Sequence, residues 1–162
     1  MSAEQITILG IGCTLYADQG FGVHMIQTLK ERYEFPEHVL LIDGGLLGVG
    51  LTGTIARTDY LIAVDAFCNG GSPGDIYRLE EKQILERLTG KNHVQHVEFL
   101  EALAHCQALD DPPQTVLLGI EPGDTKSVVC ELTPELHRKV DEMIGCILSE
   151  LDRLGVTYSI KG

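Results

Sequence analysis

The chain has 162 residues, of which 44% are hydrophobic and 22% charged; these values exclude a disordered chain and predict a single domain over residues 1–162. Acidic residues outnumber basic ones by 24 to 12, and the resulting net charge of −12 argues against nucleic acid or an anionic membrane surface as a partner. No apolar run approaches the roughly 20 residues of a membrane span, and the N-terminus lacks the features of a signal peptide, so we expect a cytoplasmic protein.

Short apolar runs alternate with helical patterns in the first half of the chain. Residues 6–11, 39–42 and 61–64 are rich in β-branched and aliphatic side chains and are predicted to be buried strands. Residues 21–33 carry one apolar stripe at helical spacing, and residues 46–55 repeat that spacing with several glycines. Each of these two segments is therefore predicted to be a helix between two strands.

The second half opens with a turn cluster and continues the alternation. The predicted elements are, in chain order, a turn at 69–74, an edge strand at 75–79, a short helix at 80–88, a helix at 92–104, a buried strand at 115–120 and a helix at 134–154. Thr133 followed by Pro134 is a strong signal for the start of the last helix. Gly155 is predicted to end it.

Strands that are apolar on both faces and alternate with helices predict a mostly parallel sheet covered on both sides. The fold class is therefore α/β, a three-layer αβα sandwich with a twisted sheet. In such sheets the functional site lies at the carboxyl ends of the strands.

Three acidic residues follow predicted strands. Asp18 lies in the loop after the first strand, while Asp43 and Asp65 directly follow the second and third. Carboxylates gathered on one rim repel one another unless a cation joins them or their pKa values separate. The three aspartates together favour a cation or acid/base site, although any one of them alone is better explained as a helix cap or a turn residue.

Other chemistries have weaker signals. The segment 10–15 lacks the third glycine of a dinucleotide-binding loop. Five widely spaced cysteines without a CxxC pair argue against disulfides and a zinc knuckle. Cys68 could act as a nucleophile beside a histidine, and His93 and His96, three residues apart at a helix start, could instead bind a metal.

Taken together, several short motifs resemble the maturation endopeptidases of nickel-iron hydrogenases. They occur in the family's order over most of the chain. They are Gly-Ile-Gly at 10–12, Asp-Gln-Gly-Phe-Gly-Val at 18–23, Asp-Gly-Gly-Leu-Leu-Gly at 43–48, Val-Asp-Ala at 64–66, Pro-Gly at 73–74, Phe-Leu-Glu-Ala-Leu-Ala at 99–104, Gly-Ile-Glu-Pro at 119–122 and Leu-Thr-Pro at 132–134.

The resemblance implies an enzyme, a metal-dependent endopeptidase, which we also class as aspartic-type, that removes a short C-terminal peptide from the hydrogenase large-subunit precursor. The family cuts only after nickel has entered the precursor, so nickel is recognised in the substrate and the free protein need hold no metal. The Asp-Gly-Gly loop, here Asp43, Gly44 and Gly45, helps to recognise the precursor, and we add Asp18 to that surface. The family has no serine or cysteine nucleophile.

The family's metal ligands are a Glu in the first loop, an Asp ending the third strand and a His opening a later helix. The Asp corresponds to Asp65, which the resemblance makes the catalytic residue. Gln19 stands at the Glu position and Gln95 at the His position, with His93 and His96 beside it. Amide oxygens are weaker ligands for nickel than carboxylate or imidazole.

These two substitutions leave two readings open. The chain is either an active peptidase that uses Asp65 with His93 or His96, or an impaired relative that acts as a binding module or chaperone for a hydrogenase large subunit. An unrelated hydrolase of the same architecture is a third reading. The peptidase reading requires Asp65 to face an open crevice. No coiled-coil seam is left over, so we expect a monomer.

Overall fold

The computed structural model describes residues 3–44, 50–89, 102–106, 108 and 112–162. The elements in chain order are β1 (Ile6–Gly10), the 3-10 helix η1 (Ala17–Gly20), α1 (Phe21–Arg32), β2 (Tyr33–Glu34), β3 (Val39–Asp43), α2 (Gly50–Ala56), β4 (Tyr60–Ala66), β5 (Ile76–Glu80), α3 (Glu81–Thr89), β6 (Gln114–Ile120), α5 (Pro134–His137), α6 (Val140–Arg153) and β7 (Ser159–Ile160). Residues 102–106 are also helical. In this described part of the chain, no helix is both long and apolar enough to cross a bilayer.

The main sheet has five strands in the order β3-β1-β4-β6-β5. Strands β3, β1, β4 and β6 are parallel, and β5 runs antiparallel to β6 at the edge. The predicted mostly parallel sheet is therefore confirmed, including the edge strand. Because β4 lies between β1 and β6, its carboxyl end is at the centre of the rim where the four parallel strands end.

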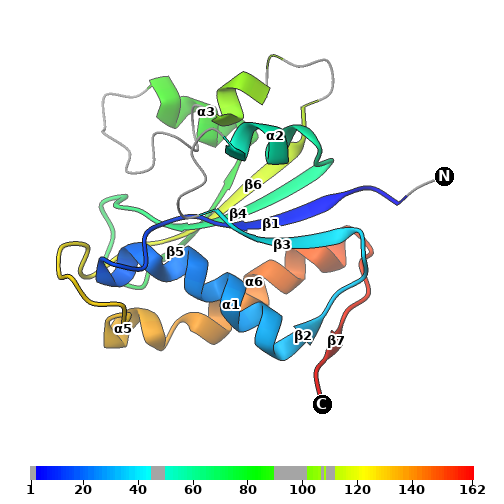
Figure 1. The fold of residues 1–162 in the computed structure, drawn as a ribbon. Coiled ribbons are helices and arrows are strands. Elements are labelled where there is room, and N and C mark those ends of the chain that lie inside the picture. Colours follow the sequence, from blue (N-terminus) through cyan, green and yellow to red (C-terminus); the bar gives the residue numbers. More distant parts are fainter. Residues whose placement is uncertain (1–2, 45–49, 90–101, 107, 109–111) are drawn as a thin grey trace.

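Helices cover both faces of this sheet (Figure 1). Helices α1, α5 and α6 lie on one face, where they share a core with side chains such as Ile8 and Val64. Helices α2 and α3 and residues 102–106 lie on the other, over a second core that includes Leu9 and Phe67. The strand side chains alternate between these cores, as the two-residue period of a strand requires.

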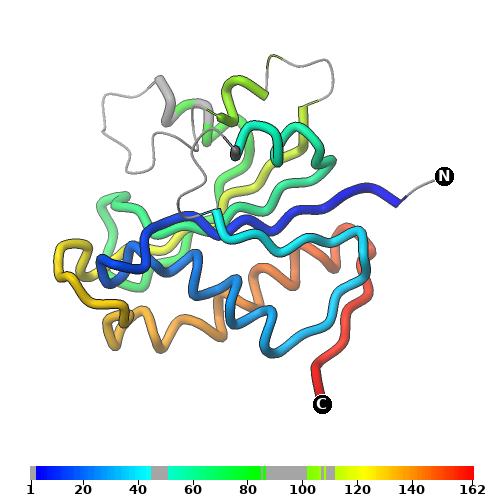
Figure 2. The backbone as a smooth tube through the Cα atoms, in the orientation of Figure 1, coloured from blue at the N-terminus to red at the C-terminus, as the bar shows by residue number. Residues whose placement is uncertain are grey.

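The structure departs from the predicted elements in two places, and two further predicted helices are described only in part. The last helix is divided into α5 and α6 by a turn at residues 138–139. The helices predicted at 46–55 and 92–104 lie partly outside the described residues. A second, two-stranded sheet pairs β2 with β7, and Figure 2 shows the C-terminal segment running beside the segment that follows α1. Strands of two residues carry too little periodicity to be predicted.

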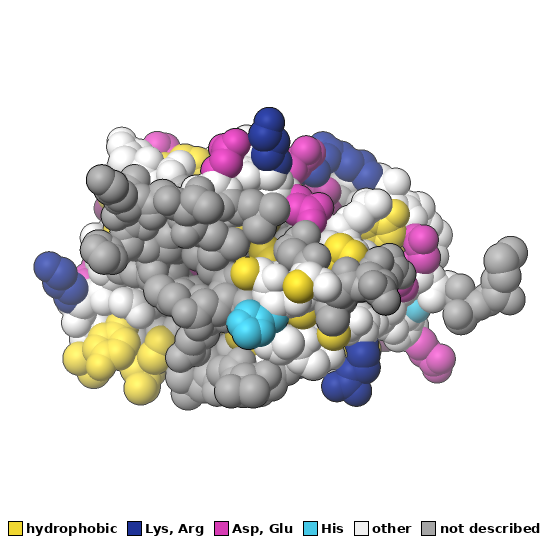
Figure 3. All heavy atoms as spheres, turned by 90° about the horizontal axis from the view of Figure 1, so that it is seen from above, with side chains coloured by type: hydrophobic (Ala, Val, Ile, Leu, Met, Phe, Trp, Pro, Cys, Tyr) yellow, Lys and Arg dark blue, Asp and Glu magenta, His cyan; other side chains and the backbone are white. Residues whose placement is uncertain are grey.

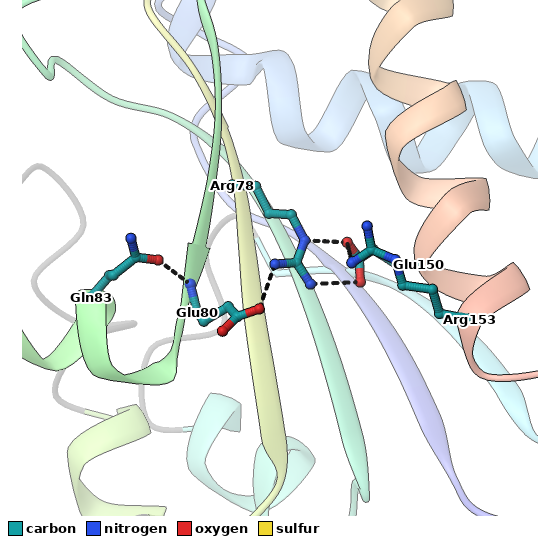
Figure 4. Close-up of polar contacts among 5 residues, drawn as sticks. All are labelled: Arg78, Glu80, Gln83, Glu150 and Arg153. Carbon is teal, nitrogen blue, oxygen red and sulfur yellow. Dashed lines mark hydrogen bonds and ion pairs between the residues drawn. The ribbon is translucent and has the colours of Figure 1, made fainter.

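An ion-pair network ties α6 to the edge strand β5 (Figure 4). The Nε atom of Arg78 donates to Glu150 Oε1 at 2.5 Å, and Nη2 donates to Glu150 Oε2 at 3.2 Å. Nη1 of Arg78 donates to Glu80 at 2.7 Å. These two carboxylates raise the pKa of the guanidinium. The network borders a cavity of about 450 Å³ that is also lined by Tyr60 and Gln114, the first residues of β4 and β6.

Candidate active site at the carboxyl ends of the strands

The strand registers bring the predicted acidic residues to one end of the sheet. Gly10 of β1 is paired with Asp43 on one side and with Val64 on the other. Asp65 is therefore one residue beyond this level, paired with Gly119 of β6. The cavity beside Arg78 lies at the opposite end of these strands. The charged side chains of Arg78, Glu80 and Glu150 that line this cavity are paired with one another, so we assign the cavity no part in the site.

Asp65 is buried on the face of the sheet that α2 and α3 cover. Its neighbours at alternate positions, Ala63 and Phe67, belong to the core on that face, so alternation directs the Asp65 side chain there. The residue is only 3% exposed. The expectation that Asp65 faces an open crevice is therefore wrong for this structure, because β4 is the central strand and both faces of the sheet are covered.

Burial gives the Asp65 carboxyl an unusual charge state. Loss of water around the carboxylate raises its pKa well above the ordinary value, and the backbone N–H of Ala66 offsets only part of this shift. Asp65 therefore keeps its proton at pH values where an exposed aspartate is ionised. A cation near the group would favour the carboxylate and release that proton.

Asp18 has a structural role that both of its oxygens serve. It is 0% exposed and accepts hydrogen bonds from the backbone N–H groups of Gly123 at 2.8 Å and Asp124 at 2.9 Å. It also accepts from the backbone N–H of Thr133 at 2.8 Å and from the Thr133 hydroxyl at 2.9 and 3.1 Å. The side chain thus joins η1 to the loop 121–133. A part for Asp18 in precursor recognition stays a prediction, and this burial makes any such part indirect.

Gln19, the next residue, is half-buried in the same pair of loops. Its Nε2 donates to the carbonyl of Thr125 at 3.0 Å, which fixes the orientation of the amide. The backbone carbonyl of Gln19 accepts from Cys13 N–H at 3.1 Å. It also approaches Gly12 so closely that a Cβ there would overlap it, and Gly12 has a φ of +130°. Glycine at position 12 is therefore required to hold the Gln19 backbone in place.

Asp43 ends β3 and is exposed, as a recognition residue would be. Gly44 is buried, and its N–H donates to the carbonyl of Gly10 at 2.8 Å. A Cβ at Gly44 would lie 2.5 Å from Leu9 Cδ1, so a larger residue would have to displace the Leu9 side chain. Gly45 lies outside the described residues.

The remaining predicted ligands, His93, Gln95 and His96, also lie outside the described residues. In the part of the chain that the structure does describe, no three His, Cys, Asp or Glu side chains converge as a metal site. Cys68, the alternative nucleophile, is exposed just after β4. The structure gives the positions of Asp65 and Gln19, and the ligand set as a whole stays a prediction.

Glu121 is a third buried carboxylate at this rim, after Asp18 and Asp65, and was not among the predicted site residues. It is 4% exposed and accepts hydrogen bonds from the backbone N–H of Asn69 at 2.9 and 3.0 Å and of Gly71 at 2.5 Å. The Tyr77 hydroxyl donates to it at 3.2 Å. Glu121 therefore holds the loop that follows β4. That loop begins two residues after Asp65, at the same rim. Two sequence signals were present: an acid directly after a buried strand, as at Asp43 and Asp65, and the Gly-Ile-Glu-Pro motif at 119–122.

Comparisons with known proteins decide which family this site belongs to. A family model described as hydrogenase maturation protease matches residues 23–150. The hydrogenase expression/formation protein HupD of Thiocapsa roseopersicina is 32% identical over 157 residues, which cover 96% of this chain and 71% of that protein. The chain belongs to the hydrogenase maturation protease family.

Two further relatives come from Escherichia coli. The hydrogenase 2 maturation protease is 27% identical over 154 residues, covering 94% of this chain and 93% of that protein. The solved structure of the hydrogenase maturating endopeptidase HybD superposes with a TM-score of 0.90 at 26% identity, over 97% of this chain and 98% of that one. These findings bear out the α/β fold and the peptidase reading, and they favour it over a binding module.

Family membership also corrects one prediction. Hydrogenase maturation proteases are metal-dependent, so the expectation of an aspartic-type endopeptidase is wrong. The geometry agrees with this correction, because an aspartic peptidase needs two carboxylates that share a proton. Burial is the main cause of the raised pKa of Asp65, and no carboxylate contributes to it among the described residues. Asp18, the other buried aspartate among the described residues, already accepts hydrogen bonds from four donor groups.

Proposed function

We propose that this hydrogenase maturation protease hydrolyses one peptide bond near the C-terminus of a nickel-loaded hydrogenase large-subunit precursor and releases a short peptide. One observation carries the proposal: a buried carboxyl, Asp65, lies one residue before the end of the central strand, in a fold that matches a solved maturation endopeptidase over 97% of the chain. The position is the one at which the family resemblance expects an aspartate ligand.

We assign the contact with the precursor's nickel to Asp65, with an imidazole from His93 or His96 and the amide oxygens of Gln19 and Gln95 as further ligands. A buried carboxyl suits this role because burial raises its pKa, so that a cation arriving beside it favours the carboxylate and the release of the proton. The free protein then needs no metal of its own. Nickel held by the substrate supplies a Lewis acid that polarises a carbonyl or a bound water.

Recognition of the precursor is assigned to the exposed Asp43 and the glycines that follow it, Gly44 and Gly45. Without side chains, these glycines let another backbone approach closely. Because Asp65 is 3% exposed, the proposal includes a displacement of the atoms that cover it when the precursor docks. We further propose that the enzyme is a single-domain monomer that acts in the cytoplasm, without nucleic acid or membrane as a partner.

The experiment is to incubate the purified chain with its cognate precursor, nickel-loaded in one sample and nickel-free in the other, and to read intact masses. The proposal expects the nickel-loaded precursor alone to lose the mass of a short C-terminal peptide. Tight binding of the loaded precursor without any loss of mass would instead favour a binding module or chaperone. Equal cleavage of both samples would contradict recognition through nickel.

A further inference from the structure

Exposed apolar side chains gather in two loops at the same rim as Asp65. The described residues contain six exposed large hydrophobic side chains, and four of them lie in these loops. Leu15 and Tyr16, in the loop after β1, are 54% and 40% exposed. Val128 and Val129, in the loop after β6, are 75% and 49% exposed. Figure 3 shows hydrophobic side chains gathered at the left-hand corner of the surface, at the end of the molecule where the loop 121–133 lies in Figure 1.

Hydrogen bonds join the two loops directly behind these side chains. The N–H of Ala17 donates to the carbonyl of Val129 at 2.8 Å, and the N–H of Asp18 donates to the carbonyl of Asp124 at 2.9 Å. We call the surface formed by Leu15, Tyr16, Val128 and Val129 the apolar patch. It is a joint product of two segments that are more than a hundred residues apart in sequence.

The loop that carries the two valines is also held from within. One carboxylate oxygen of Asp124 accepts the N–H groups of Lys126 at 2.9 Å and Ser127 at 3.0 Å. A hydrogen bond from the Ser127 side chain, together with these two backbone bonds, lowers the pKa of Asp124 to about 2. The valines therefore follow directly after a segment that these hydrogen bonds hold. A surface that is already ordered loses little conformational entropy when a partner covers it.

The patch lies on the same rim of the sheet as the candidate active site. Its two loops leave the carboxyl ends of β1 and β6, the strands on either side of β4, and Asp65 is near the end of β4. Gln19, a candidate ligand, lies in the same pair of loops and donates to Thr125. Any folded protein that brings a peptide bond to this rim must therefore pass close to the patch.

The charge of the patch contrasts with the rest of the molecule. The chain carries 36 charged side chains and a net charge of −12, yet residues 125–130 contain a single charged side chain, that of Lys126. Apolar groups that are contiguous on a surface mark contacts with proteins, membranes or ligands. An acidic molecule is repelled by anionic membranes, which leaves a protein as the favoured partner.

We propose that the apolar patch is the docking surface for the folded body of the precursor, distinct from the residues that act on the scissile bond. This inference rests on the proposed function, which supplies a protein substrate at this rim. It also gives Asp18 an indirect part in recognition, because Asp18 joins the two loops that form the patch. The patch would set affinity for the precursor, while Asp65 and its fellow ligands would set the rate of cleavage.

The test compares Val128→Asp with Ile160→Asp, a matched control. Ile160 is 74% exposed, nearly the same as Val128, but belongs to β7 in the second sheet. Both variants add one negative charge at an exposed aliphatic position. Leu15→Ser and Leu40→Ser form a second matched pair, since Leu40 is 45% exposed on β3. Thermal unfolding of all four variants establishes that each is folded.

Binding of the nickel-loaded precursor is measured by titration calorimetry, and cleavage by intact mass. We expect Val128→Asp and Leu15→Ser to weaken the Kd about tenfold or more, with the KM raised and kcat within about twofold of the unaltered chain. The two controls should bind as the unaltered chain does. Equal Kd values for Val128→Asp and Ile160→Asp, or no binding by the unaltered chain, would overturn the proposal that the apolar patch is the docking surface. Binding without cleavage by the unaltered chain would overturn the proposed function alone.

Discussion

The carboxylate of Asp18 accepts hydrogen bonds from both the backbone N–H and the side-chain hydroxyl of Thr133, which is 115 residues further along the chain. Thr133 directly precedes α5, so this contact fixes the start of the last helical segment against the loop after β1. With the bonds from Gly123 and Asp124, Asp18 connects three separate backbone segments at the rim of the candidate site.

Asp18→Asn is expected to destabilise the fold by about 2–4 kcal/mol. The amide nitrogen of asparagine would face N–H and O–H donors, so buried donors lose an acceptor, and bonds to a charged group are stronger than neutral ones. The measurement is the free energy of unfolding by chemical denaturation. Asp141→Asn is the control, because the Asp141 side chain is 84% exposed and pairs with Arg32 only at the surface; it should change stability by less than about 1 kcal/mol. Equal effects of the two substitutions would contradict the role of Asp18.

Arg78→Met is expected to cost about 1–3 kcal/mol without affecting cleavage of the precursor. It leaves the Glu150 carboxylate, whose side chain is 10% exposed, without its main partner. The cost is held below that of a fully buried pair because Arg78 is 35% exposed. The double variant Arg78→Met/Glu150→Leu should recover much of the loss, since apolar replacement of both partners removes the stranded charge. A loss of cleavage in a folded variant would show that the amino end of the sheet contributes to the activity.

Asp65→Asn is expected to be more stable than the unaltered chain at neutral pH. The folded-state pKa of Asp65 is raised above the ordinary value of 3.8, so the folded chain holds a proton that the unfolded chain releases. Stability of the unaltered chain should therefore fall as the pH rises from about 4 towards the folded-state pKa. Asparagine does not titrate, and the difference between the two proteins should grow across that window. Unfolding free energies measured at a series of pH values check this, and a less stable variant at pH 7 would contradict it.

Gln19→Glu is expected to lower the stability of the fold and to raise its affinity for nickel. The Gln19 amide donates to the carbonyl of Thr125, and a carboxylate cannot, so the variant should lose about 1 kcal/mol. A carboxylate is also a stronger ligand than an amide oxygen for nickel, so calorimetry should detect tighter nickel binding by the variant. Gln27→Glu, an exposed position in α1, adds the same charge away from the rim and should leave nickel affinity unchanged. If both variants bind nickel equally, Gln19 does not face the metal.

Much of the fold follows from the sequence because the sheet is apolar on both faces. The runs at 6–11, 61–64 and 115–120 correspond to β1, β4 and β6, whose burial leaves little room for polar residues. Local pattern could not predict the division between α5 and α6. Local pattern also could not predict the pairing of β2 with β7, because each strand has only two residues and the two strands are far apart in sequence.

The site was predicted less completely than the fold. An aspartate that follows a buried strand was a correct signal for the rim, but it did not separate the exposed Asp43 from the buried Asp18. That difference depends on donors contributed by Gly123, Asp124 and Thr133, which are distant in sequence. Glu121 was missed for the same reason, because its partners, such as Asn69, come from another loop. The burial of Asp65 likewise depends on the order of strands, which places β4 at the centre of the sheet.

The central claim is that the Asp65 carboxylate is the group through which this protease acts on its precursor. The most direct test is the single-turnover rate of peptide release from nickel-loaded precursor, measured by intact mass for the unaltered chain and for Asp65→Asn, whose fold is verified by unfolding. We predict that the unaltered chain releases the peptide and that the variant is slower by about a hundredfold or more. Release at the same rate by both proteins would contradict the claim.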